Sequence, residues 1–209
     1  MPQYVRYAVD DHVATITMDR PEKLNAFNGP MRTETWEAFH SAEDDEDVRA
    51  VVICGTGRAF CAGADLVEFE SPEAVKARSG PFWRPVERDT LWGNWEMTKP
   101  VIAAIHGYCV AGGFEIAGFA DIRVCSEDAK FGSPQQAFNI GDGYMAALLP
   151  RLIGASDAAY YLYTGEMFSG TEAKAMGFVT RLLPDRDAAV AEATAIARRI
   201  AENGPMSIQ

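Results

Sequence analysis

The chain has 209 residues, of which 48% are hydrophobic and 23% are charged, and its formal net charge is −11 at pH 7. These values are typical of one globular α/β domain spanning 1–209, and they exclude a disordered or fibrous chain. The negative charge argues against sequence-independent binding of nucleic acid, although backbone amides can still hold an anionic ligand.

The first quarter of the chain predicts a hairpin, a helix and a buried strand. Apolar and polar residues alternate on both sides of Asp10 and Asp11, which indicates two antiparallel strands. Met31, Trp36 and Phe39 then follow at helical spacing. The expected elements are a β-hairpin (3–9 and 12–18), a turn-rich stretch (20–30), a helix (31–46) and a strand (49–55).

The rest of the chain alternates between apolar strands and helices, which favours a largely buried sheet. A surface insertion resembling a lid is expected over 68–96, which is rich in proline, tryptophan and charge. The elements expected after it are a strand (98–107), a helix (112–120), an extended stretch (121–132), helices (144–154, 156–165 and 171–177), a strand (178–184) and a long amphipathic helix (186–204).

The cysteines and histidines do not form a metal-binding pattern. The four cysteines lack C-x-x-C spacing, so we expect buried, reduced thiols and no metal site. The N-terminus lacks the basic and apolar parts of a signal peptide, and no stretch resembles a membrane span, so we expect a cytoplasmic protein without a membrane partner. The cysteines are Cys54, Cys61, Cys109 and Cys125.

Glu115 is the only formally charged residue between Lys99 and Asp121. It lies in "VAGGFEIAG", where every other residue is small or apolar. Burial of a lone carboxylate is unfavourable unless something holds it. Glu115 is therefore either exposed or kept inside for chemistry, whereas Asp121 is expected to be a turn residue between helix and strand.

Two strands end in turns made of small residues, "VVICGTGRAFCAGADL" (51–66) and "VIAAIHGYCVAGGFEI" (101–116). In both, glycines and alanines follow the strand and a helix then begins, which lets backbone N–H groups point into a shared space. Two converging amides form an oxyanion hole, which stabilises negative charge that develops on an oxygen during a reaction.

Several segments occur together in an order that resembles the enoyl-CoA hydratase/isomerase (crotonase) superfamily, from about Tyr4 to the end. They are "RPEKLNAFN", "GRAFCAGADL", "KPVIAAIHGYCVAGGFEIA", "DIRVCSEDAKFGSP" and "YTGEMFSGTEAKAMGFVTRLLP". The resemblance implies an α/β crotonase-like (ClpP/crotonase) fold of repeated ββα units with surrounding helices. The C-terminal helical region after about residue 186 is shorter than the family pattern.

The resemblance also implies ligands and site residues. The substrate would be an acyl-CoA thioester, with coenzyme A as part of the substrate and no separate cofactor, and the assembly a homotrimer or a dimer of trimers. Glu115 would be the acid/base. The two oxyanion amides would be those of Ala64 and Gly112. The residues bordering coenzyme A would be Lys23, Leu24, Ala62, Ala64, Asp65, Leu66 and Gly112.

The sequence departs from the hydratase pattern at Gln135, where hydratases carry a second glutamate after the "FG-x-P" turn. A glutamine amide can orient water or substrate, but it is not a general acid or base. Asp142 either replaces the missing proton carrier or is a turn residue before Gly143. Glu115 has an alternative role as a helix-capping carboxylate, and Trp83, Trp92 and Trp95 either shape the acyl pocket or anchor the core.

The resemblance therefore implies an enoyl-CoA hydratase or isomerase. An acyl-CoA-binding protein without catalytic activity and another enolate reaction, such as decarboxylation or thioester hydrolysis, are the alternatives.

Overall fold

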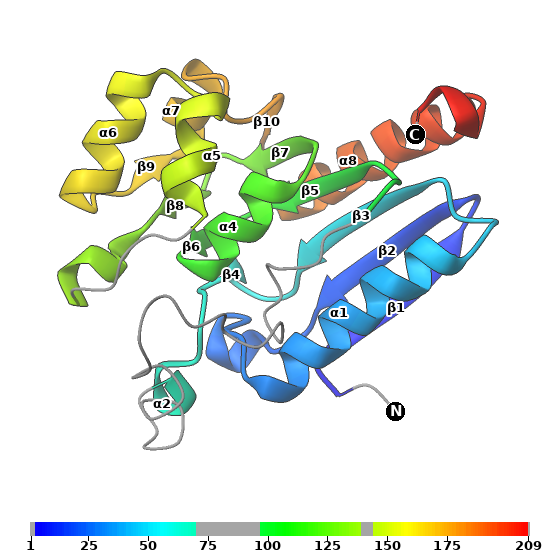
Figure 1. The fold of residues 1–209 in the computed structure, drawn as a ribbon, viewed down its shortest axis with the longest axis horizontal. Coiled ribbons are helices and arrows are strands. Elements are labelled where there is room, and N and C mark those ends of the chain that lie inside the picture. The colour runs from blue at the N-terminus through cyan, green and yellow to red at the C-terminus, as the bar shows by residue number, and fades with distance from the viewer. Residues whose placement is uncertain (1–2, 70–96, 139–143, 209) are drawn as a thin grey trace.

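A computed structural model describes residues 3–69, 97–138 and 144–208 of the chain, which form two β-sheets with helices around them (Figure 1). Most of the insertion expected over 68–96 lies outside the described residues, as do its three tryptophans and Asp142. No helix in the described ranges is both long enough and apolar enough to cross a membrane.

The larger sheet has six strands in the order β1-β2-β3-β5-β7-β10. Only β1 and β2 are antiparallel, and the other neighbours in this sheet pair in parallel. The strands are β1 (Val5–Asp10), β2 (Val13–Met18), β3 (Ala50–Gly55), β5 (Val101–Ile105), β7 (Ile122–Ser126) and β10 (Arg181–Leu183).

The expected hairpin is confirmed, with Asp10 paired to Val13 across the turn. Asp11 and His12 occupy the turn with φ angles of 48° and 63°. Positive φ at both central residues is the geometry of the tight turns that match the twist of a hairpin.

The smaller sheet has four strands in the order β4-β6-β8-β9: β4 (Ala59–Cys61), β6 (Tyr108–Val110), β8 (Lys130–Gly132) and β9 (Phe168–Ser169). Strands β3, β5 and β7 of the large sheet are each followed by a strand of the small sheet. Helix α2 (Leu66–Phe69) follows β4, α4 (Gly112–Phe119) follows β6, and the 3-10 helix η2 (Pro134–Phe138) follows β8. This repetition confirms the expected α/β fold of ββα units.

The sequence analysis was wrong in placing the small-residue turns directly after β3 and β5. Strands β4 and β6 intervene, and each has only three residues. A strand of this length is too short to show an alternating pattern, and it is defined by its neighbours in the sheet.

The remaining α-helices of the described chain agree with the expected elements to within a few residues. Helix α1 begins at Gly29 rather than Met31, because the Asn28 side chain accepts a hydrogen bond from Met31 N (2.9 Å) and Pro30 fits the first turn. The remaining α-helices are α1 (Gly29–Asp44), α5 (Met145–Leu152), α6 (Ala155–Thr164), α7 (Gly170–Ala175) and α8 (Arg186–Ala201). Two 3-10 helices that the sequence analysis did not predict are η1 (Pro21–Lys23) and η3 (Pro205–Ser207).

The two faces of the large sheet are covered by different elements. Along β3, Val52 packs in a cluster with α8, whereas Val51 and Ile53 belong to the cluster on the other face. Three fully buried alanines, four residues apart on one side of α8, pack against the sheet, and their small size allows close approach of the helix: Ala189, Ala193 and Ala197.

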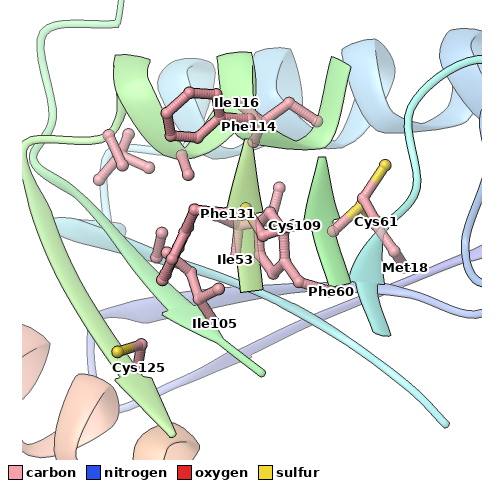
Figure 2. Close-up of a cluster of buried hydrophobic side chains, with 14 of the residues drawn as sticks. Met18, Ile53, Phe60, Cys61, Ile105, Cys109, Phe114, Ile116, Cys125 and Phe131 are labelled. Atoms are coloured by element: carbon pink, nitrogen blue, oxygen red, sulfur yellow. The ribbon is translucent and has the colours of Figure 1, made fainter. Parts of the chain in front are cut away.

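The main core fills the space between the large sheet, the small sheet and α4. Figure 2 shows Phe114 and Ile116 of α4 on one side of this cluster and Ile53 and Ile105 of the large sheet on the other. All four cysteines are buried and form no disulfide, as expected. Burial raises the pKa of Cys61 to about 12, so this residue is a packing group rather than a nucleophile.

Two polar side chains hold the C-terminal end of α4. The guanidinium of Arg123 is buried and donates to the carbonyls of Ala117 (3.2 Å), Ala120 and Phe178 (2.7 Å). Asp121 accepts a hydrogen bond from Val101 N at 2.8 Å, which confirms it as a turn residue. The helix that carries Glu115 is therefore anchored independently of its N-terminus.

Candidate active site

The two small-residue turns emerge from neighbouring strands of the small sheet. Strands β4 and β6 are parallel, with Cys61 paired to Cys109, and both turns follow the carboxyl ends of these strands. Parallel strands place their carboxyl ends at the same edge of a sheet, so the turns lie side by side. This is the juxtaposition that the sequence predicted.

The turns are in direct backbone contact at Gly63. A Cβ atom at this position would lie 2.8 Å from Ala111 Cβ, 3.0 Å from Gly112 N and 3.2 Å from Val110 O. Gly63 also has a φ of +88°, which other residues rarely adopt. Only glycine therefore allows the first turn to approach the second this closely.

The amide of Ala64 faces away from its β-bridge partner. Phe27 N donates to Gly63 O at 2.7 Å, and Asp65 N donates to Phe27 O at 2.8 Å. In this parallel bridge Phe27 makes its two hydrogen bonds with Gly63 and Asp65, the residues on either side of Ala64. The N–H of Ala64 itself therefore points away from Phe27.

The amide of Gly112 is the first of helix α4, and the first N–H groups of a helix have no partner within it. The preceding residue, Ala111, has φ 49° and ψ −123°, an unfavourable conformation for alanine that costs about 1–3 kcal/mol. Ala111 N donates to Gly132 O of β8 at 3.0 Å, which holds this sharp turn in place.

Glu115 is buried, with 8% of its surface exposed, so the structure excludes the exposed alternative. It lies in the first turn of α4, and its N–H donates to Ala111 O at 3.0 Å. Its neighbours Phe114 and Ile116 are buried at 1% and 0% exposure. The N-terminal end of a helix favours a negative charge.

Gln135 lies on η2, directly after β8, and β8 pairs in parallel with β6. Glu115 and Gln135 therefore follow the carboxyl ends of neighbouring strands. The structure brings both to the same edge of the small sheet as Ala64 and Gly112.

The residues expected to border coenzyme A form a second part of this edge. Ala62 N donates to Leu24 O at 3.0 Å, which joins the turn after η1 to the turn after β4. Lys23 is exposed at the end of η1, and Leu66 is 52% exposed at the start of α2. These surfaces are accessible to a ligand.

Comparison with known proteins identifies the family to which the chain belongs. The sequence model described as enoyl-CoA hydratase/isomerase matches residues 9–209. The chain belongs to the enoyl-CoA hydratase/isomerase family.

Among relatives, "Enoyl-CoA hydratase EchA19" of Mycobacterium tuberculosis is 35% identical over 200 residues, covering 95% of this chain and 74% of the relative. The mitochondrial "Delta(3,5)-Delta(2,4)-dienoyl-CoA isomerase" of Rattus norvegicus is 34% identical over 212 residues, covering 95% of this chain and 64% of the relative. The solved structure of an enoyl-CoA hydratase/isomerase from Mycobacterium paratuberculosis superposes with a TM-score of 0.88 at 30% identity, covering 100% of this chain and 80% of that one. These similarities confirm the crotonase fold.

The sequence analysis missed Arg20, which supports the turn that carries Ala64. Its guanidinium donates to Asp65 at 2.8 Å and to Ala26 O at 2.9 Å, and it lies over the Tyr4 ring. The hydrogen bond from Arg20 holds the pKa of Asp65 below its usual range. The pair ties the segment before η1 to the turn that carries Ala64.

Asn25 was also missed, although it is fully buried in the turn after η1. Its side chain accepts from Arg20 N at 2.8 Å and donates to Thr56 O (2.9 Å) and Ala59 O (2.8 Å). The only signal in the sequence is a polar residue between the apolar Leu24 and Ala26. The described residues contain no cluster of three or more side chains suited to a metal ion.

Proposed function

We propose that this protein catalyses hydration or double-bond isomerisation of an enoyl-CoA thioester through a stabilised enolate. The observation that carries the proposal is the convergence of two backbone turns beside a buried carboxylate. The amides of Ala64 and Gly112 would hold the thioester oxygen, and Glu115 would transfer protons. Lys23, Leu24, Ala62, Asp65 and Leu66 would border the coenzyme A part.

In isomerisation, the Glu115 carboxylate would remove a proton from the α-carbon of a 3-enoyl thioester. The electron pair would move toward the thioester oxygen, where the two amides stabilise the negative charge. Return of the proton to the γ-carbon then forms the 2-enoyl product. One base is sufficient, because the proton that leaves one carbon returns to another.

In hydration, water adds to the β-carbon of a 2-enoyl thioester and a proton is added to the α-carbon. Glu115 would take a proton from the water as its oxygen bonds to the β-carbon, and would then deliver that proton to the α-carbon of the enolate, while Gln135 would orient the water without exchanging a proton. With Glu115 as the one proton carrier proposed among the described residues, the site would support isomerisation more directly than hydration. The role of Asp142 as a second proton carrier remains a prediction from the sequence.

The test is turnover of a trans-2-enoyl-CoA and of its 3-enoyl isomer by the wild-type chain and by Glu115→Gln. We expect the variant to lose activity on both substrates and to retain binding of a saturated acyl-CoA, because the amide keeps the size of the side chain but cannot exchange a proton. Glu46→Gln, at an exposed position between α1 and β3, is the matched control. Unchanged turnover by Glu115→Gln would contradict the proposal.

A wild-type chain that binds acyl-CoA without converting either isomer would favour the alternatives, namely a binding protein or another enolate reaction such as decarboxylation or thioester hydrolysis. The trimer, or dimer of trimers, is a further proposal from the family resemblance. Measurement of the molar mass in solution tests it.

A further inference from the structure

Ser133 contains a buried hydroxyl that the fold does not use. The residue is 2% exposed, and its Oγ has no hydrogen-bond partner within the described part of the chain. Buried hydroxyl groups are usually paired, because loss of their hydrogen bonds to water is unfavourable. An unpaired one therefore requires an explanation.

The buried Ser126 shows the usual arrangement in the same protein. It is 0% exposed, and its Oγ contacts Ile105 O at 3.4 Å and donates to the carboxylate of Asp128. The two serines thus have similar burial but differ in hydrogen bonding. Burial alone therefore does not explain why the Ser133 hydroxyl lacks a hydrogen-bond partner.

The position of Ser133 connects it to the candidate active site. It directly follows Gly132, the residue of β8 that pairs with Val110 and accepts the hydrogen bond from Ala111 N at 3.0 Å. Ser133 is therefore beside the turn that presents the Gly112 amide. Gln135 follows two residues later, and Glu115 lies one helical turn beyond Ala111.

A hydroxyl group can donate one hydrogen bond and accept others, so it is complementary to an oxygen atom of a ligand. The proposed reactions place such atoms at this edge, namely the reacting water and the acyl oxygen. We propose that the Ser133 hydroxyl hydrogen-bonds an oxygen atom at the reacting end of the bound acyl-CoA complex. This inference rests on the proposed function for the identity of the ligand.

The substitution Ser133→Ala separates this role from a structural one. If the hydroxyl serves only the ligand, its removal relieves an unpaired buried group, so the free protein unfolds at a higher urea concentration than wild type. The same variant loses a hydrogen bond in the complex, and we expect turnover to fall about tenfold. Ser126→Ala is the matched control, with a lower urea midpoint and wild-type turnover.

The two substrates identify the oxygen that Ser133 contacts. Loss of hydration with normal isomerisation supports contact with the reacting water. Loss of both activities, together with weaker binding of a saturated acyl-CoA, supports contact with the acyl oxygen.

The inference is overturned if Ser133→Ala is less stable than wild type or fails to fold, because the hydroxyl then has a structural role. Wild-type turnover of both substrates by Ser133→Ala overturns it as well. If the wild-type chain converts neither substrate, the proposed function fails and this inference fails with it. If the wild-type chain turns over its substrate and Ser133→Ala does so equally well, the inference about Ser133 is refuted while the proposed function stands.

Discussion

The contact between the two active-site turns can be tested at Gly63, even though backbone amides cannot be deleted by ordinary substitution. The substitution Gly63→Ala places a Cβ atom 2.8 Å from Ala111 Cβ and 3.0 Å from Gly112 N. Because carbon atoms pack favourably at about 3.5 Å or more, the turns must separate by about 0.7 Å. The Ala64 and Gly112 amides then no longer converge on one oxygen.

This displacement predicts a large effect on catalysis. A misplacement of about 1 Å can cost about 100-fold in rate, and loss of one oxyanion donor costs about 100-fold or more. We therefore expect the kcat of Gly63→Ala to fall about 10- to 100-fold. Turnover of an enoyl-CoA, followed by absorbance, measures it.

Gly177 provides the control for backbone strain. Its φ of +81° is close to the +88° of Gly63, but a Cβ atom there would have no neighbour within 4 Å. Gly177→Ala should lower the free energy of unfolding by about 1–2 kcal/mol, because the residue adopts a left-handed conformation, and Gly63→Ala should lower it further because of the added steric clash. Only Gly63→Ala should also lose activity, so equal kcat values for the two variants would refute the reasoning.

Two further predictions concern stability. Burial lowers the pKa of His106, so the unfolded chain binds a proton more readily and the free energy of unfolding should fall as the pH drops below about 6.5. His106→Gln, which can still donate to Gly57 O, should flatten this dependence in urea titrations between about pH 7 and pH 5, and an unchanged slope would contradict the assignment to His106. Asn25→Ala should lower the free energy of unfolding by about 3 kcal/mol, because it leaves several buried backbone groups without partners. The exposed Asn203→Ala should change it by about 0.5 kcal/mol or less, and similar losses for both variants would show that the Asn25 network is not needed.

Glu115 illustrates how much a local pattern can reveal. A single charge within small and apolar residues already indicated a special position, and the structure shows that Glu115 is buried in the first turn of α4. The role of Glu115 in proton transfer stays a prediction. The pattern left exposure and burial open and the tertiary structure decided between them, whereas the role of Glu115 depends on the ligand that it contacts.

The sequence by itself determined the hairpin, most helices, the main strands and the two small-residue turns, because each depends on neighbours within a few positions. Only the tertiary structure revealed the short strands β4 and β6, the Arg20–Asp65 pair and the unpaired hydroxyl of Ser133. These features depend on contacts between segments that are far apart in the chain. The approach of Gly63 to Gly112 is of the same kind, since the glycine is visible in the sequence but the backbone that it must accommodate is not.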